Sequence, residues 1–149
     1  MEKKFVVARE PQDLIKFFPV MKELRPHLEM ESYLSIYQEA HRNDGYEIVA
    51  IEANGQVQAV MGYRLIADYV RGRHVYIDDL VVSETVRSKG LGGELLKYAE
   101  GVAKENNCDT LRLCTGIEND RGVKFYEKSG WTKRAFAYTK KITISSKKS

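Results

Sequence analysis

The feature that most constrains this chain is a strand-like run, a glycine-rich loop and a helical pattern in direct succession. Residues 75–82 (VYIDDLVV) are apolar except for Asp78 and Asp79, which predicts a strand covered on both faces of a sheet. Residues 87–93 (RSKGLGG) follow, and then an amphipathic helix with apolar positions at Leu95, Leu96, Ala99, Val102 and Ala103. A helix start with free N–H groups and glycines can bind a phosphate group.

The remaining pattern predicts an α/β fold with a mixed central sheet, in which two helices separate the first strand from the second. The first helix begins at Pro11 and should be kinked or ended by Pro19, whereas the second closes at residues 43–45 (NDG). The pair Asn54 and Gly55 predicts a tight hairpin turn. The expected strands cover residues 5–9, 46–53, 56–65, 75–82, 110–115 and 131–144, and a further short helix covers residues 120–128.

Length and composition set the class of protein. The 149 residues suit one domain, which we expect over residues 1–144 with a polar tail over 145–149. A net charge of +3 argues against nucleic-acid binding driven by bulk charge. No apolar run approaches the roughly 20 residues that span a bilayer and no secretion signal opens the chain, so we expect a cytoplasmic protein without a membrane partner.

The cysteines and histidines do not suggest a metal or a disulfide framework. Cys108, Cys114 and three scattered histidines lack the spacing of a zinc site. Cys114 falls on an expected core strand and should be a small apolar filler. We therefore expect no metal cofactor.

The glycine loop does not fit the two common nucleotide motifs. A nucleoside-triphosphate loop needs two glycines four residues apart followed by Lys and Ser or Thr, and a dinucleotide fingerprint needs glycine where Leu95 stands. A nucleotide-binding domain therefore remains only as a lesser alternative. Taken alone, the glycines could also simply allow a sharp turn from strand to helix.

Two motifs together resemble the GNAT (Gcn5-related) N-acetyltransferases, and the resemblance covers nearly the whole chain. The first is Arg87-x-x-Gly90-x-Gly92. The second runs from Asn119 to Phe125-Tyr126, with Gly130-Trp131 after it. Residues 76–79 (YIDD) are also similar to the polyamine acetyltransferase branch. The resemblance implies the acyl-CoA N-acyltransferase fold, with acetyl-CoA held between two splayed parallel strands, residues 75–82 and 110–115.

The resemblance also implies which residues bind the coenzyme. Leu80 and Val82 would pair with the pantetheine amides, and a strand N–H near Val81 or Val82 would stabilise the oxyanion. The loop N–H groups would hold the pyrophosphate. The complete expected set is Leu80, Val81, Val82, Arg87, Ser88, Lys89, Gly90, Leu91, Gly92, Gly93, Asn119 and Tyr126. For Asn119, the alternative is a helix N-cap.

Tyr126, Asp78 and Asp79 are the candidate catalytic residues. By resemblance, the Tyr126 phenol protonates the departing thiolate, Asp78 acts as a base through water, and Asp79 binds a cationic amine. Tyr126 could instead be a core tyrosine. Because neighbouring strand residues face opposite sides unless a bulge intervenes, we expect one aspartate to face the acceptor directly. Structurally, a carboxylate could instead pair with Arg71, Arg73 or His74.

The combined interpretation is an N-acetyltransferase that transfers acetyl from acetyl-CoA to a primary amine by direct attack in a ternary complex. The acceptor, a small molecule or a peptide amine, is left open, as is the use of other acyl-CoAs. Glu29 and Glu31 could line the acceptor mouth or simply complement a helix dipole. The rival function is a non-catalytic acyl-CoA sensor or interaction module. The last expected strand could pair across a homodimer or complete the sheet.

Overall fold

The computed structural model describes residues 2–145, and the chain forms two compact units, Met1–Leu113 and Cys114–Ser149. Within the described residues, no helix is long and apolar enough to cross a membrane. The same part of the chain holds no group of three or more His, Cys, Asp or Glu side chains placed to bind a metal ion.

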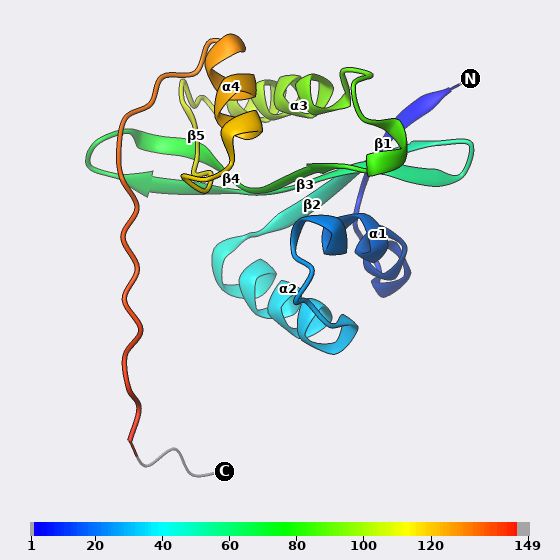
Figure 1. The fold of residues 1–149 in the computed structure, drawn as a ribbon, viewed down its shortest axis with the longest axis horizontal. Coiled ribbons are helices and arrows are strands. Elements are labelled where there is room, and N and C mark those ends of the chain that lie inside the picture. Colours follow the sequence, from blue (N-terminus) through cyan, green and yellow to red (C-terminus); the bar gives the residue numbers. More distant parts are fainter. Residues whose placement is uncertain (1, 146–149) are drawn as a thin grey trace. The chain divides into compact units, whose positions relative to one another are not determined.

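The first unit is built on a five-stranded mixed sheet in the order β1-β2-β3-β4-β5 (Figure 1). All neighbours are antiparallel except β4 and β5, which are parallel, so the expected α/β fold with a parallel strand pair is confirmed. The strands are β1 (Lys3–Val7), β2 (Glu47–Ala53), β3 (Gln56–Asp68), β4 (Gly72–Val82) and β5 (Leu111–Leu113).

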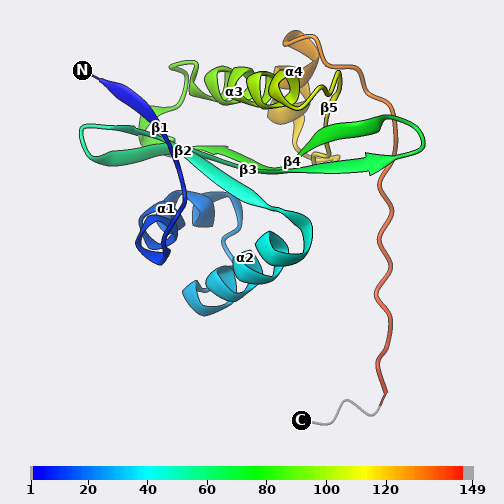
Figure 2. The same ribbon diagram turned by 180° about the vertical axis from the view of Figure 1, so that it is seen from behind.

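Helices cover both faces of this sheet. The helices α1 (Pro11–Leu24) and α2 (Met30–Asp44) lie on one face, and α3 (Leu91–Glu105) lies on the other (Figures 1 and 2). A short 3₁₀ turn, η1 (Glu84–Val86), connects β4 to the loop before α3. Two-sided coverage explains why residues 75–82 of β4 are apolar except for Asp78 and Asp79.

Local sequence signals set most element ends. Asn54 and Gly55 adopt φ of 56° and 75°, which confirms the tight turn between β2 and β3. Gly45 ends α2 with φ of 69°, also as expected. Pro19 does not end α1, because the helix continues to Leu24. The buried side chains after it, Val20 and Met21, anchor the last turn in the core.

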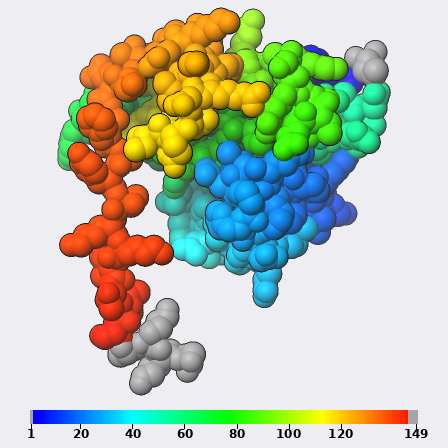
Figure 3. All heavy atoms as spheres, in the orientation of Figure 1, coloured from blue at the N-terminus to red at the C-terminus, as the bar shows by residue number. Residues whose placement is uncertain are grey.

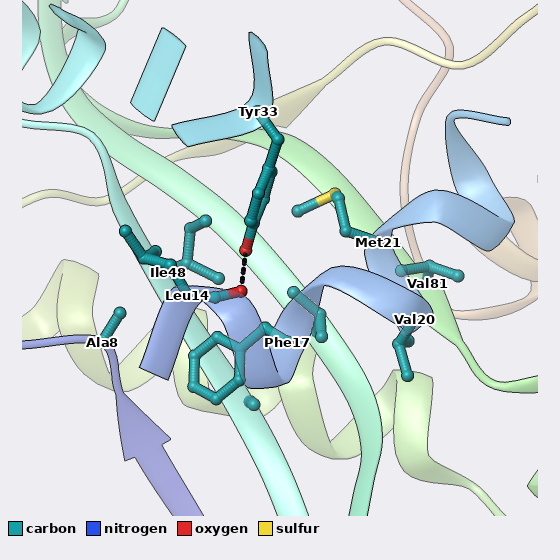
Figure 4. Close-up of a cluster of buried hydrophobic side chains, with 10 residues drawn as sticks. Ala8, Leu14, Phe17, Val20, Met21, Tyr33, Ile48 and Val81 are labelled. Atoms are coloured by element: carbon teal, nitrogen blue, oxygen red, sulfur yellow. Dashed lines mark hydrogen bonds between the residues drawn. The ribbon is translucent and has the colours of Figure 1, made fainter. Parts of the chain in front are cut away.

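The core under the sheet joins α1 to α2. Phe17 is fully buried, and the Tyr33 hydroxyl donates a hydrogen bond of 2.7 Å to the Leu14 carbonyl (Figure 4). Because that carbonyl accepts a side-chain hydrogen bond from the other helix, the bond fixes α2 against α1. These contacts position the wall of the cavity described below.

The second unit contains one helix, α4 (Asp120–Lys128), as expected. Residues 131–144, all of which the structure describes, form no strand, so the expected last strand is wrong. Phe136, Tyr138, Ile142 and Ile144 are exposed. Alternating apolar residues favour a strand only where another strand pairs with them, and the described residues supply none.

Two further expectations concern Cys114 and the polar tail. Cys114 is exposed, not a buried filler, because β5 ends at Leu113 before reaching it. Cys108 is the buried cysteine. Of the expected polar tail, residues 146–149 lie outside the described residues.

Candidate active site

A β-bulge in β4 brings the side chains of Asp78 and Asp79 into one cavity. On β3, Gly62 pairs with Asp79 and Tyr63 pairs with Ile77, which leaves Asp78 as an extra residue. An extra residue breaks the alternation of side chains along a strand. Both aspartates therefore line the same cavity, and the expectation that only one would face it is wrong.

The cavity has a volume of about 470 Å³ and lies within the first unit. Its lining comes from α1, α2, the segment between them, and the strands β2 to β4. Tyr33, Tyr37 and Tyr76 contribute aromatic surface, whereas the charged side chains come from Arg25, Arg64, Asp78 and Asp79. A cavity of this size, with an apolar wall and a few convergent polar groups, suits a small molecule or one side chain.

Asp79 is fixed by three hydrogen bonds. Arg25 donates from Nε and Nη2 to Asp79 Oδ1, at 3.2 and 3.0 Å. The Tyr46 hydroxyl donates to Asp79 Oδ2 at 2.6 Å. Burial and the neighbouring Asp79 charge together raise the pKa of Tyr46 well above its ordinary value, so this phenol stays protonated and serves as a donor.

Asp78 has a different environment. Arg64 donates from Nη2 to Asp78 Oδ1 at 2.8 Å and from Nε to Oδ2 at 3.1 Å, a two-pronged ion pair. Burial raises the pKa of Asp78 above its ordinary value, although the hydrogen bonds and charge of Arg64 oppose that shift. Asp78 is therefore more basic than an ordinary aspartate, and Arg64 occupies two of the roughly four hydrogen bonds that its carboxylate can accept.

The structure does not pair Asp78 or Asp79 with Arg71, Arg73 or His74, the residues expected from the sequence as their structural partners. Arg71 pairs with Asp68 at 3.0 Å, and Arg73 donates to the Asn106 side chain. His74 is fully buried and its Nδ1 contacts the Gly72 carbonyl. Asp78 and Asp79 instead pair with Arg64 and Arg25.

Gly62 makes room for this arrangement. A Cβ atom at residue 62 would collide with the Tyr46 hydroxyl and lie 2.8 Å from Asp79 Oδ2. Residue 62 is also the bulge partner on β3. The absent side chain thus lets the phenol reach the carboxylate across β3.

Beyond the bulge, the edge of β4 that faces away from β3 pairs with no strand among the described residues, and its Val82 carbonyl accepts a hydrogen bond of 3.3 Å from Arg87 Nε. β5 pairs with β4 only from Val75 to Ile77, whereas β4 continues to Val82. The Ser83 N–H bonds to the Gln58 carbonyl, at the end of the pairing with β3. By alternation along a strand, the N–H groups of Leu80 and Val82 therefore point away from β3, and that of Val81 points toward it.

The glycine loop forms an uncapped helix start. Ser88 and Gly90 adopt φ of 70° and 80°, and Gly90 is the N-cap of α3 without a side-chain hydrogen bond. Glu94 N–H makes the first bond, to the Gly90 carbonyl, so the N–H groups of residues 91–93 have no partner within the helix. Residues 87–90 of the loop, which include Arg87 and Lys89, are exposed. The loop lies at the surface in the bright green region of Figure 3.

Tyr126 and Asn119 belong to the second unit. Burial raises the pKa of Tyr126 above its ordinary value of about 10. Its ring lies 5.6 Å from that of Trp131, edge to face. The side chain of Asn119 accepts a hydrogen bond of 3.1 Å from the Gly122 N–H and so acts as the N-cap of α4, which was the alternative role expected for it. A role of either residue toward the coenzyme stays a prediction.

Sequence reasoning missed Arg25, Arg64, Tyr46 and Gly62. Gly62 and Arg64 lie on β3, Arg25 follows α1 and Tyr46 precedes β2, and no motif joins them to residues 78 and 79. The one available signal was that two carboxylates on a buried strand need cationic partners. Glu29 and Glu31, proposed for the acceptor mouth, do not line the cavity.

Comparisons with known proteins match these features. The acetyltransferase (GNAT) family matches residues 12–131. The uncharacterized N-acetyltransferase YhdJ of Bacillus subtilis is 30% identical over 126 residues, which cover 84% of this chain and 89% of that protein. A thialysine N-epsilon-acetyltransferase of Bos taurus is 28% identical over 142 residues, covering 85% and 84%.

Among solved structures, AAC(6')-Iy in complex with a bisubstrate analogue of coenzyme A superposes with a TM-score of 0.81. The alignment covers 95% of this chain and 100% of that chain at 18% sequence identity. At this identity the likeness shows a shared fold.

Proposed function

Because this chain belongs to the GNAT acetyltransferase family, a family of acetyl-CoA-dependent N-acetyltransferases, we propose that it transfers acetyl directly to a primary amine bound in the cavity beside Asp78 and Asp79. The observation that carries the proposal is the continuity of β4. Its bulge puts two carboxylates into a cavity, and its next residues offer a backbone edge that pairs with no strand among the described residues and leads to the glycine loop. Acceptor and coenzyme would thus meet along one strand.

In this proposal the coenzyme binds mainly through backbone groups. The amides of an extended pantetheine arm pair with the β4 edge at Leu80 and Val82, as an added strand would. The pyrophosphate lies on the N–H groups of residues 91–93, near Arg87, Ser88 and Lys89, where the helix dipole favours an anion. Of Val81 and Val82, only Val82 has an N–H directed away from β3, so an oxyanion bond from that N–H would leave the pantetheine pairing at Val82 to its carbonyl.

Asp78 is the proposed base. The acceptor must lose a proton before its nitrogen attacks the thioester carbon, and a buried carboxylate with a raised pKa accepts that proton better than an ordinary one. Asp79 already accepts three hydrogen bonds, which favours an orienting role. The proton passes to Asp78, directly or through a water.

Tyr126 is the proposed general acid. As the new C–N bond forms and the C–S bond of the tetrahedral intermediate breaks, the thiolate takes a proton from the phenol. A raised pKa keeps this phenol protonated throughout the neutral range, as an acid requires. Asn119 would orient the pantetheine arm through its fixed side chain.

Thiol release from acetyl-CoA with a panel of primary amines tests the proposal. We expect turnover by the parent and a product that is heavier than the amine by one acetyl group, with loss of rate but retained coenzyme binding in Asp78→Asn and Tyr126→Phe. Asp68→Asn, at a carboxylate paired with Arg71, is the control and should keep its rate. Coenzyme binding without turnover on any amine would overturn the proposal and favour an acyl-CoA sensor.

A further inference from the structure

Charged side chains of both signs line the cavity, which restricts the class of acceptor beyond the proposed function. Its lining holds two carboxylates, Asp78 and Asp79, and two guanidinium groups, Arg25 and Arg64. Each carboxylate pairs with one arginine, at 2.8 Å for Asp78 and 3.0 Å for Asp79. A polycationic amine would bring further positive charge next to two guanidinium groups in about 470 Å³.

The two arginines differ in what they can still bind. Each of the three nitrogens of Arg64 bonds to a carboxylate, since Nε and Nη2 bond to Asp78 and Nη1 bonds to Asp44. Arg25 uses Nε and Nη2 on Asp79 and on the Asp78 carbonyl. Among the described residues, no acceptor bonds to the two N–H groups of Arg25 Nη1, and the side chain is 43% exposed.

Arg25 therefore presents an unused cationic edge within reach of the aspartates. His27, on the same segment between α1 and α2, also lines the cavity and has a ring N–H that can donate a hydrogen bond. A carboxylate can accept about four hydrogen bonds, and Arg64 donates two to Asp78. The lining of the cavity therefore includes both an anion-binding group, Arg25, and a cation-binding group, Asp78.

We infer that the acceptor is a small zwitterion, an amine that also carries a carboxylate, of amino-acid size. This inference rests on the proposed function and names its substrate class. The amine lies at Asp78, where the β4 edge begins, and the carboxylate accepts charge-assisted hydrogen bonds from Arg25 Nη1. The aromatic and aliphatic wall of Tyr33, Tyr37 and Leu28 packs against the carbon chain between them.

Matched pairs of amines test this inference. Each amino acid is compared with its decarboxylated counterpart: glycine with methylamine, ornithine with putrescine, and lysine with cadaverine, with lysinamide as a charge-blocked analogue. For the preferred pair, we expect kcat/KM to be at least about 10-fold higher for the amino acid, mainly through KM, because the charge-assisted bond is lost with the carboxylate. Equal or better turnover of the decarboxylated amine or of the amide overturns the inference.

Arg25→Gln gives the sharper readout. The variant loses the anion-binding group and leaves Asp79 without its cationic partner, so kcat/KM should fall for the amino acid and rise for the diamine. General damage to the fold would lower both. Thermal unfolding and coenzyme binding serve as controls for folding, and Arg71→Gln, remote from the cavity, should leave the ratio unchanged. An equal loss on both substrates in a folded Arg25→Gln protein contradicts the role of Arg25.

A second measurement does not depend on any variant. Hexanoate, which is lysine without its two amines, should inhibit the parent competitively against the amine acceptor, whereas hexanamide should not. Inhibition by both compounds alike would contradict an anion site. If no amine in the panel is acetylated although coenzyme binds, the proposed function itself fails; if amines are acetylated without preference for a carboxylate, only the inference fails.

Discussion

Two regions of the first unit, one made by backbone and one by side chains, divide the proposed work. The coenzyme edge consists of the β4 backbone at residues 80–82 and the loop of residues 87–93, where N–H groups, positive φ angles and small side chains matter. The acceptor cavity is lined by charged, aromatic and aliphatic side chains from α1, α2, the segment between them and the strands β2 to β4. A backbone site requires particular residue types at fixed spacing, whereas a side-chain site requires particular contacts in three dimensions.

This difference predicts which substitutions act on which substrate. Changes in the cavity should alter the rate and the choice of amine with little effect on coenzyme affinity. Changes in the glycine loop should lower coenzyme affinity with little effect on the choice of amine. The two regions adjoin at residues 78–80, so the bulge is where the separation should be weakest.

The largest effect is expected from Asp78→Asn. Loss of a general base lowers kcat by roughly 100-fold to 10,000-fold. Coenzyme affinity, measured by calorimetry, should change less than about twofold, because the β4 edge is intact. A comparable loss of coenzyme binding would contradict the separation of the two regions.

Gly62→Ala should disturb the cavity without any change in charge. The added methyl group meets the Tyr46 hydroxyl and Asp79, so we expect a loss of about 1–3 kcal/mol in the free energy of unfolding, measured with denaturant. Tyr46→Phe in the same chain removes one of the colliding atoms. A double-mutant cycle should therefore show coupling between residues 46 and 62, and strictly additive effects would contradict the contact.

Gly90→Ala tests the coenzyme edge against a matched control, Gly55→Ala. Both glycines have positive φ, 80° and 75°, and an added Cβ has open space at both, so each substitution should lower the free energy of unfolding by about 1–2 kcal/mol. Only Gly90→Ala should weaken coenzyme binding, by about 10-fold, because its methyl group projects where the phosphate approaches. Equal coenzyme affinity in the two variants would contradict the loop assignment.

The smallest effect concerns pH. The base works only when deprotonated, so the rate falls as pH drops through the pKa of Asp78. Arg64 lowers that pKa, and Arg64→Gln should therefore move the acid limb of the kcat profile to higher pH. Arg71→Gln, which breaks a surface pair with Asp68, should leave the limb in place. A limb that moves to lower pH in Arg64→Gln would contradict the assignment of Asp78.

The same contrast explains how much could be predicted from sequence. Gly90 and the Asn54–Gly55 pair were predictable because positive φ selects glycine and asparagine. The bulge at Asp78 was not, because it depends on which residue of β3 pairs with Asp79. Arg25 lies more than 50 residues before its partner, and only the fold joins them.

The expected last strand failed for a related reason. Alternating apolar residues from Phe136 to Ile144 satisfy the local preference for a strand, but a strand also requires hydrogen-bonding partners. None is present among the described residues. Cys114 was misjudged in the same way, because the strand that would have buried it stops at Leu113.

A crystal structure with coenzyme A tests the central claim most directly. The account predicts pantetheine amides bonded to the backbone of Leu80 and Val82, the pyrophosphate on the N–H groups of residues 91–93, and the thiol directed toward the cavity of Asp78. Coenzyme bound elsewhere, or a β4 edge paired along its whole length with another strand while coenzyme is present, would contradict it.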